Sequence, residues 1–195
     1  MIATERLNYF IKIVIYVFFL TFFVIYEPAL PSEKAIKSLN EGQKIVFIRH
    51  SLAPGNGDPI NINLKDCSTQ RNLNQLGIDQ SKKIGTFFKK NKIKIDRVLS
   101  SEWCRCKDTA KYAFGNFETF NALNSFYSEK FYKNKSQQII DLKNFIKNWD
   151  DKNNIIFVTH FVVISEMLNI GVSSGEIVIV DKKLNFIDSI KINIK

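Results

Sequence analysis

The chain has 195 residues, 45% of them hydrophobic and 24% charged, which fits one folded domain with a single core rather than several domains. Its formal net charge of +9 would attract nucleic acid, anionic lipid or phosphorylated molecules. No long run of Lys or Arg occurs, and the densest basic clusters, at 82–83 and 89–94, fit the solvent face of a helix. No nucleic-acid partner is therefore expected.

Residues 1–30 are predicted to be an N-terminal signal or membrane anchor. Arg6 and Lys12 precede an uncharged, apolar run over 13–26. A basic start followed by such a run is typical of an export signal. A small-x-small cleavage site is missing, which favours an uncleaved anchor with its positive flank inside. We expect an exported protein, either anchored in the inner membrane with the domain on the periplasmic or extracellular side, or cleaved and periplasmic.

Residues 31–43 are predicted to form a polar tether, and 44–195 the catalytic domain. Apolar, β-branched runs predict strands, and helical spacing of apolar residues predicts helices. The expected strands are 44–50, 95–100 and 154–160, the expected helices 73–92, 102–114, 136–149 and 161–168, and a hairpin over 175–187 closes the chain. Strands that alternate with helices predict a three-layer α/β/α sandwich with a mostly parallel sheet.

The only two histidines of the chain each end an apolar strand. His50 follows Arg49 at the end of the first strand, and His160 ends the strand over 154–160. Because ligands bind at the carboxyl ends of parallel strands, both imidazoles should face one edge of the sheet. Arg105 lies one turn into the helix that follows a third strand. Two arginines and two imidazoles near helix N-termini favour a phosphate ligand.

Phosphoryl transfer requires a nucleophile in line with phosphorus and fixed positive donors around its oxygens. A histidine can be that nucleophile if a backbone carbonyl holds its far ring nitrogen as N–H. The sequence contains no Walker loop, which excludes a P-loop nucleotide hydrolase, and no Gly-x-Ser-x-Gly elbow, which disfavours a serine hydrolase.

Three cysteines, Cys67, Cys104 and Cys106, would lie in an oxidising compartment if the domain is exported. Cys104 and Cys106 are too close in sequence to pair with each other, so Cys67 is expected to pair with one of them. Three cysteines and a histidine would also suit zinc, but their spacing lacks the usual paired ligands. We therefore predict no metal site and no cofactor.

Four ordered sequence blocks make the chain resemble the histidine phosphatase superfamily, which is also called phosphoglycerate-mutase-like. Together they span about 44–181, and only their order makes the resemblance specific. The blocks are Phe47-Ile48-Arg49-His50, then Arg71-x-Leu73-x-x-x-Gly77-x-x-Gln80, then Ser100-Ser101 with Arg105 and Thr109-Ala110, then Val158-Thr159-His160.

The resemblance implies a phosphoglycerate-mutase-like fold and a role for each matched residue. His50 would attack phosphorus and carry a phosphohistidine, while Arg49, Arg105 and His160 would hold the phosphoryl oxygens. The implied activity is hydrolysis of a phosphomonoester or phosphoramidate, on a phosphorylated small molecule or a phosphorylated protein side chain. A non-catalytic domain of the same fold that only binds a phosphorylated ligand is the alternative, and a redox or zinc protein is a more distant one.

Departures from the family pattern concern substrate binding and the general acid. Ser51 replaces the family's common Gly after the nucleophile and is a candidate phosphate contact, as is Asn56 in the following loop. Phe161 stands where one branch of the family carries an acidic residue. The general acid is therefore left open between Glu129 and Asp58.

Overall fold

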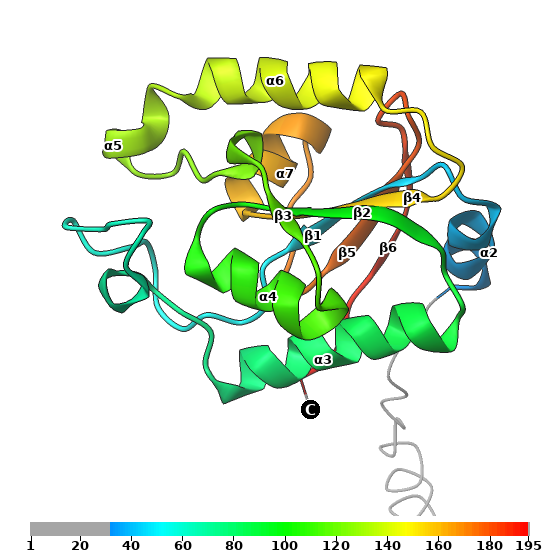
Figure 1. Cartoon of the computed structure of the whole chain (residues 1–195), viewed down its shortest axis with the longest axis horizontal. Coiled ribbons are helices and arrows are strands. Elements are labelled where there is room, and N and C mark those ends of the chain that lie inside the picture. Colours follow the sequence, from blue (N-terminus) through cyan, green and yellow to red (C-terminus); the bar gives the residue numbers. More distant parts are fainter. Residues whose placement is uncertain (1–31, 195) are drawn as a thin grey trace, which may run out of the picture. The chain divides into compact units, whose positions relative to one another are not determined.

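The computed structural model describes residues 32–194, in which six strands form one mixed sheet (Figure 1). The strands lie in the order β3-β2-β4-β1-β5-β6, and only β5 runs antiparallel to the others. Their bounds are β1 (Ile45–Arg49), β2 (Ile95–Ser100), β3 (Glu118–Thr119), β4 (Asn154–Thr159), β5 (Ile177–Val180) and β6 (Phe186–Ile190). The predicted closing hairpin is the antiparallel pair of β5 and β6.

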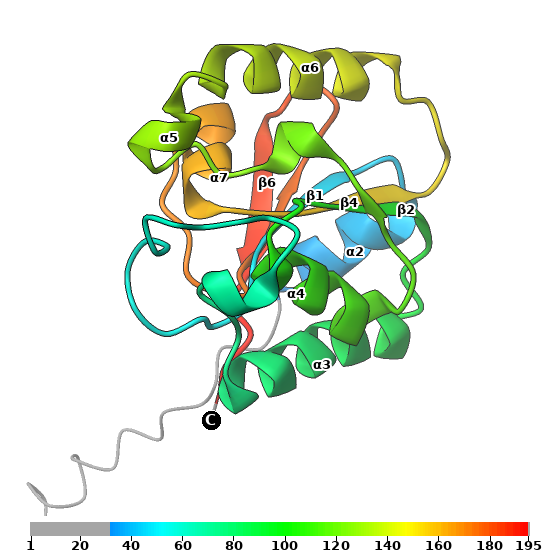
Figure 2. The same ribbon diagram turned by 60° about the vertical axis from the view of Figure 1, so that its left-hand side comes forward.

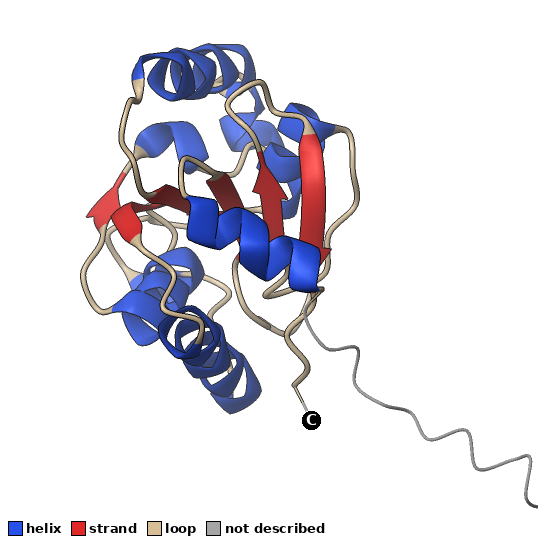
Figure 3. Ribbon diagram, turned by 90° about the vertical axis from the view of Figure 1, so that its right-hand side faces the viewer, coloured by secondary structure: helices blue, strands red, loops and turns tan. Residues whose placement is uncertain are grey.

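Helices cover both faces of the sheet, which confirms the predicted α/β/α sandwich (Figures 1 and 3). Helices α3 (Gln75–Lys90) and α4 (Cys104–Phe114) cover one face, and α6 (Lys135–Asn148) and α7 (Phe161–Leu168) cover the other. Shorter elements complete the described residues, namely α2 (Glu33–Glu41), η1 (Cys67–Thr69), η2 (Asn121–Leu123) and α5 (Glu129–Tyr132).

Strand β1 contributes to the hydrophobic core on both sides of the sheet. Val46 and Ile48 pack in the cluster that includes Ile84 of α3. Ile45 and Phe47, which alternate with them, pack in the cluster on the α6 and α7 side. Because both faces of the strand are buried, its sequence is continuously apolar rather than alternating.

The tether predicted over 31–43 is wrong for most of its length, because residues 33–41 form helix α2. The Ser32 hydroxyl caps this helix by accepting a hydrogen bond from the amide of Ala35 at 3.0 Å. Ala35 and Leu39, one turn apart, are buried in the core cluster that α3 also joins. Burial of this apolar stripe makes the segment part of the domain.

The predicted signal or anchor over 1–30 lies outside the described residues. Within 32–194, no helix is both long enough and apolar enough to cross a membrane.

The carboxyl ends of β1, β2 and β4 lie at one edge of the sheet, because these strands are parallel. The segment that follows β4 enters α7, and the segment that follows β2 enters α4. After β1, the chain makes a long loop over 50–74 before α3, and Figure 2 shows this loop in front of the same edge, near α5. The elements that follow the three strands therefore surround one end of the sheet.

Candidate active site

The four residues predicted to converge line one cavity at this edge of the sheet. Arg49, His50, Arg105 and His160 all border a cavity of about 190 Å³. The ring centroids of the two histidines lie 5.5 Å apart, and each side chain is almost fully buried. Both α4 and α7 begin here, since His160 is the N-cap of α7 and Arg105 is the second residue of α4. Helix N-termini favour an anionic ligand at this place.

The His50 ring is oriented by its own backbone. Its Nδ1 lies 2.8 Å from the carbonyl oxygen of Ser51, and a carbonyl only accepts hydrogen bonds. Nδ1 therefore carries the proton, and the lone pair of Nε2 is left free. Burial, and then the charge of Arg105, hold the pKa of His50 well below its usual value. The ring is consequently neutral and nucleophilic at pH 7.

His160 has the opposite tautomer. A guanidinium nitrogen of Arg105 lies 3.4 Å from its Nδ1 and only donates, so the proton of the neutral ring is on Nε2. Nε2 lies 2.9 Å from the Ser101 hydroxyl, which in turn donates to the side-chain oxygen of Asn124 at 3.1 Å. Burial and Arg105 lower the pKa of His160 well below its usual value. The Ser101 hydroxyl thus contacts His160, and α4 begins at Cys104.

The two predicted arginines are held differently. The Arg105 side chain is buried and forms a bidentate ion pair with Asp58, with distances of 2.6 and 3.0 Å. Arg49 donates from Nη1 to the carbonyl of Val172 at 2.8 Å and lies 5.6 Å from the centroid of the Phe161 ring. The buried Nε groups of both arginines have no hydrogen-bond partner within the described residues. These N–H groups are donors that a bound anion could satisfy.

Arg71 is a third cavity arginine, to which the sequence analysis gave no role. Its Nε donates to the carbonyl of Gly57 at 2.9 Å, and its Nη1 donates to the carbonyl of Ala53. Burial, and then the neighbouring charge of Arg105, lower the pKa of Arg71. Arg71 opens the second sequence block, so the signal for it was present in the sequence. The sequence did not show that Arg71 contacts the loop after His50.

The same block fixes the loop that follows His50. The side-chain oxygen of Gln80 accepts a hydrogen bond from the amide of Leu52 at 3.0 Å, and its nitrogen donates to the carbonyl of Ser174 at 2.8 Å. A Cβ at Gly77 would lie only 2.1 Å from the carbonyl oxygen of Leu52. The N-terminal turn of α3 therefore packs directly against the backbone next to His50, which requires glycine at 77.

The other candidate residues are distributed unevenly around the cavity. Asn56 and Asp58 line it. The Ser51 hydroxyl instead accepts a hydrogen bond from Ser81 at 2.8 Å, and Ser51 is fully buried and does not border the cavity. Glu129 is exposed at the start of α5 and lies outside the cavity lining. Asp58 is thus the only one of the two general-acid candidates that reaches the site.

Cys67 and Cys104 form a disulfide, with their Cα atoms 5.7 Å apart. It joins the loop that precedes Arg71 to the helix that carries Arg105. Cys106 is a free, buried thiol, and burial raises its pKa to about 12. Among residues 32–194, no group of three or more His, Cys, Asp or Glu side chains is placed to hold a metal ion.

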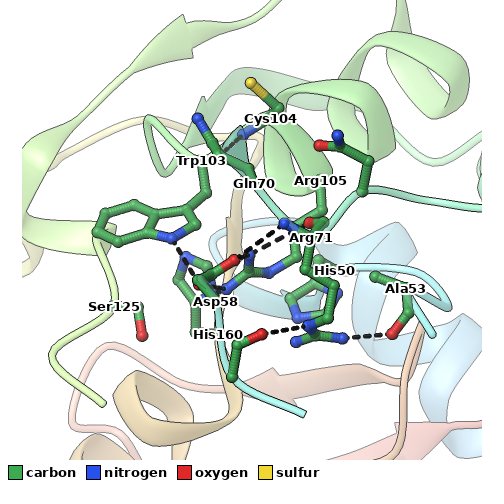
Figure 4. A network of polar contacts seen from close by, with 12 residues as sticks. His50, Ala53, Asp58, Gln70, Arg71, Trp103, Cys104, Arg105, Ser125 and His160 are labelled. Atoms are coloured by element: carbon green, nitrogen blue, oxygen red, sulfur yellow. Dashed lines mark hydrogen bonds and ion pairs between the residues drawn. The ribbon is translucent and has the colours of Figure 1, made fainter. Parts of the chain in front are cut away.

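Aromatic side chains form much of the remaining lining, and among them only Phe161 was singled out from the sequence. Trp103 donates from its indole N–H to Asp58 at 3.0 Å, and its ring lies edge-on to His160 with centroids 5.2 Å apart (Figure 4). Tyr127 and Phe161 also border the cavity, and both are exposed. No sequence pattern marks Trp103 or Tyr127 as cavity residues, because their position depends on how separate loops pack together.

The sequence matches a family model over residues 45–126, that of the Histidine phosphatase superfamily (branch 1). This segment contains Arg49, His50, Arg71 and Arg105. No curated protein matched the chain.

Solved structures of similar fold include phosphatases. The protein histidine phosphatase SixA complexed with tungstate is 16% identical, with a TM-score of 0.52 over 75% of this chain and 95% of its own. A putative phosphohistidine phosphatase SixA from Agrobacterium tumefaciens is 16% identical, with a TM-score of 0.52 over 77% and 99% of the chains. TTHB049 from Thermus thermophilus is 14% identical, with a TM-score of 0.57 over 77% and 96%. At these identities the structures show a shared fold, and the family match covers the segment that contains the first three sequence blocks.

Proposed function

We propose that this domain of the histidine phosphatase superfamily is a phosphatase that hydrolyses a phosphomonoester or phosphoramidate through a covalent phosphohistidine on His50. The observation that carries the proposal is the His50 ring itself. Its Nδ1 is 2.8 Å from a backbone carbonyl, so a neutral ring has its Nε2 lone pair available in a cavity lined by three arginines. A neutral, oriented imidazole next to fixed positive donors is what attack on phosphorus requires.

In the first half of the reaction, the Nε2 lone pair forms a bond to phosphorus while the bond to the leaving group breaks. Arg49 and Arg105 bind the phosphoryl oxygens and stabilise the charge that develops on them. His160 adds a donor, because a neighbouring phosphate dianion favours protonation of its Nδ1, the ring nitrogen on the Arg105 side. In the second half, water attacks phosphorus and the electron pair returns to Nε2.

Turnover of an aryl phosphate such as p-nitrophenyl phosphate tests the proposal. His50→Ala should lower kcat/KM by about 10³-fold or more, as expected when a covalent nucleophile is removed. Lys182→Ala, an exposed change outside the cavity lining, is the matched control and should leave turnover unchanged. Activity that persists in His50→Ala would rule out the covalent mechanism. Binding of inorganic phosphate without turnover in the wild type would instead favour the non-catalytic alternative.

The covalent intermediate can be detected directly. Wild-type protein quenched in acid after incubation with ³²P-labelled substrate should retain label that is lost on warming in acid, because phosphohistidine is acid-labile. The His50→Ala protein should retain none. Phosphohistidine peptides belong among the substrates tested, since a protein histidine phosphatase is among the structures of similar fold.

We further propose that the domain is exported and stays on the outer side of the inner membrane, anchored or cleaved. The basic and apolar residues at 1–30 support this placement, and a disulfide between Cys67 and Cys104 is compatible with an oxidising compartment. Thiol labelling of denatured protein from the cell envelope should find one reactive cysteine without reductant and three after reduction. Recovery in the cytoplasmic fraction with three free thiols would contradict the proposal.

A further inference from the structure

Asp58 is the one carboxylate among the described residues that line the cavity, and three arginines line it too. Both of its oxygens bind Arg105, at 2.6 and 3.0 Å. It also accepts hydrogen bonds from the Trp103 indole at 3.0 Å and from the Arg71 amide at 3.2 Å (Figure 4). A guanidinium fork matches carboxylate and phosphate oxygens in the same way. Asp58 therefore occupies the position on Arg105 that a phosphoryl group would take.

A phosphoryl group and Asp58 cannot both use this fork. The Nη1 and Nη2 groups of Arg105 are each engaged by Asp58, and a phosphate dianion in their place would also repel the carboxylate. Asp58 follows Gly57 and lies in a loop where Gly55 and Gly57 both have positive φ. Binding of substrate thus separates Asp58 from Arg105 while the carboxyl group remains beside the phosphorus site.

Separation of Asp58 from Arg105 should raise the pKa of the Asp58 carboxyl group. Burial on its own would raise the pKa of Asp58, but hydrogen bonds and charge from Arg105, with the Arg71 amide and the Trp103 indole, hold it below its usual range. Once the dianion has replaced it on Arg105, the main stabilisation of the carboxylate is lost and a negative charge is added nearby. His50 is neutral and does not compensate. Each of these changes favours the protonated carboxylic acid.

We propose that Asp58 is the general acid and base of the reaction, held as a carboxylate on Arg105 in the free protein and released as a proton donor when the phosphoryl group takes its place. The inference rests on the proposed phosphatase function. Once displaced from Arg105, the Asp58 carboxylate takes up a proton from water. As His50 Nε2 bonds to phosphorus and the leaving oxygen departs, that oxygen receives this proton. As water then attacks the phosphohistidine, its proton returns to the Asp58 carboxylate, and the nitrogen–phosphorus electron pair returns to Nε2.

A series of phosphate esters with leaving groups from 2,4-dinitrophenol to simple alcohols tests this role in the wild-type protein. Because protonation neutralises the leaving oxygen, kcat/KM should depend only weakly on the leaving-group pKa. A steep dependence in the wild type would overturn the proposal without any variant. Absence of turnover even for the dinitrophenyl ester would instead refute the phosphatase function, so the two failures are distinguishable.

Asp58→Asn keeps the size of the side chain and removes its proton. It should lower kcat/KM for an alkyl phosphate by about 10²-fold or more, and for the dinitrophenyl ester by less than tenfold, since that leaving group needs no proton. Asp58→Glu should recover part of the alkyl phosphate activity. Equal losses on both esters in Asp58→Asn would contradict the proposal, because a merely structural residue affects both alike.

Binding of inorganic phosphate, measured by calorimetry, tests the displacement separately. Asp58→Asn removes the negative charge that competes for Arg105, so phosphate should bind at least several-fold more tightly than to the wild type. Weaker binding in this variant would show that the carboxylate supports the anion site rather than occupying it, and would overturn the displacement step.

Discussion

Removal of the disulfide should destabilise the domain strongly, because the bridge closes a long loop. Cys67 and Cys104 are 37 residues apart in the sequence. In the chain-entropy model, closing a loop of this length lowers the entropy of the unfolded chain. This raises the free energy of unfolding by about 4 kcal/mol at 25 °C. This is a large part of the 5–15 kcal/mol that is typical of folded domains. The bridge is therefore expected to decide whether the domain is well folded or marginal.

The double variant Cys67→Ser with Cys104→Ala removes the bridge with little other change. Cys67 is exposed and accepts serine, whereas Cys104 is buried and is better replaced by an apolar residue. The free energy of unfolding falls by about 2 kcal/mol for each molar increase in urea concentration. A variant that loses about 4 kcal/mol should therefore unfold at a midpoint about 2 M lower than the wild type. Unfolding followed by circular dichroism at pH 7 measures the shift.

Reductant supplies the control. It should lower the wild-type midpoint toward that of the double variant, and it should leave the double variant unchanged. The reasoning would be refuted by a double variant whose midpoint lies within about 0.5 M of the oxidised wild type. A similar midpoint shift with reductant in the double variant would show that the reductant acts elsewhere.

Other predictions concern the histidines, the loop after the nucleophile and metal dependence. Because both ring pKa values lie well below the unfolded value of about 6.5, the two histidine NMR signals should not titrate near pH 6.5. Below pH 6.5 the unfolded chain binds more protons, so stability in urea should fall between pH 7 and pH 5; titration near 6.5 would contradict this. Gly77→Ala should cost roughly 1–3 kcal/mol in urea unfolding, since its Cβ would lie 2.1 Å from a backbone oxygen. Gly171→Ala, with only a ring atom at 3.9 Å, should be nearly neutral, and equal losses would refute the close-approach explanation. Dialysis against EDTA should leave aryl phosphate turnover unchanged, because arginines and imidazoles stabilise the charge. Restoration by zinc alone would contradict that.

The sequence by itself determined the strands and the residues at their ends. An uninterrupted apolar run that ends in His50 or His160 indicates a strand buried on both faces, and parallel strands place both rings at one edge. Arg105 was found in the same way, from its distance to the end of β2. The ordered blocks then predicted the family, and a model of that family matches residues 45–126. The predicted fold is shared with solved structures.

Sequence patterns were less informative where a segment depends on distant partners. Residues 33–41 are polar enough to suggest a tether, yet Ala35 and Leu39 are buried against the core. A short stripe of two apolar residues is a weak periodic signal, and only the surface that it packs against makes the helix stable.

Tertiary structure alone decided how the loops around the strand ends are joined. Both Cys104 and Cys106 were open as partners of Cys67, and the structure pairs it with Cys104, the first residue of α4. Glu129 and Asp58 were equally plausible as acids, and the loop over 50–74 brings Asp58 onto Arg105, which is 47 residues away in the sequence. Strand ends follow from uninterrupted local apolar runs, whereas these contacts follow from the packing of loops against separate helices. Such packing has no period, so no local pattern predicts it.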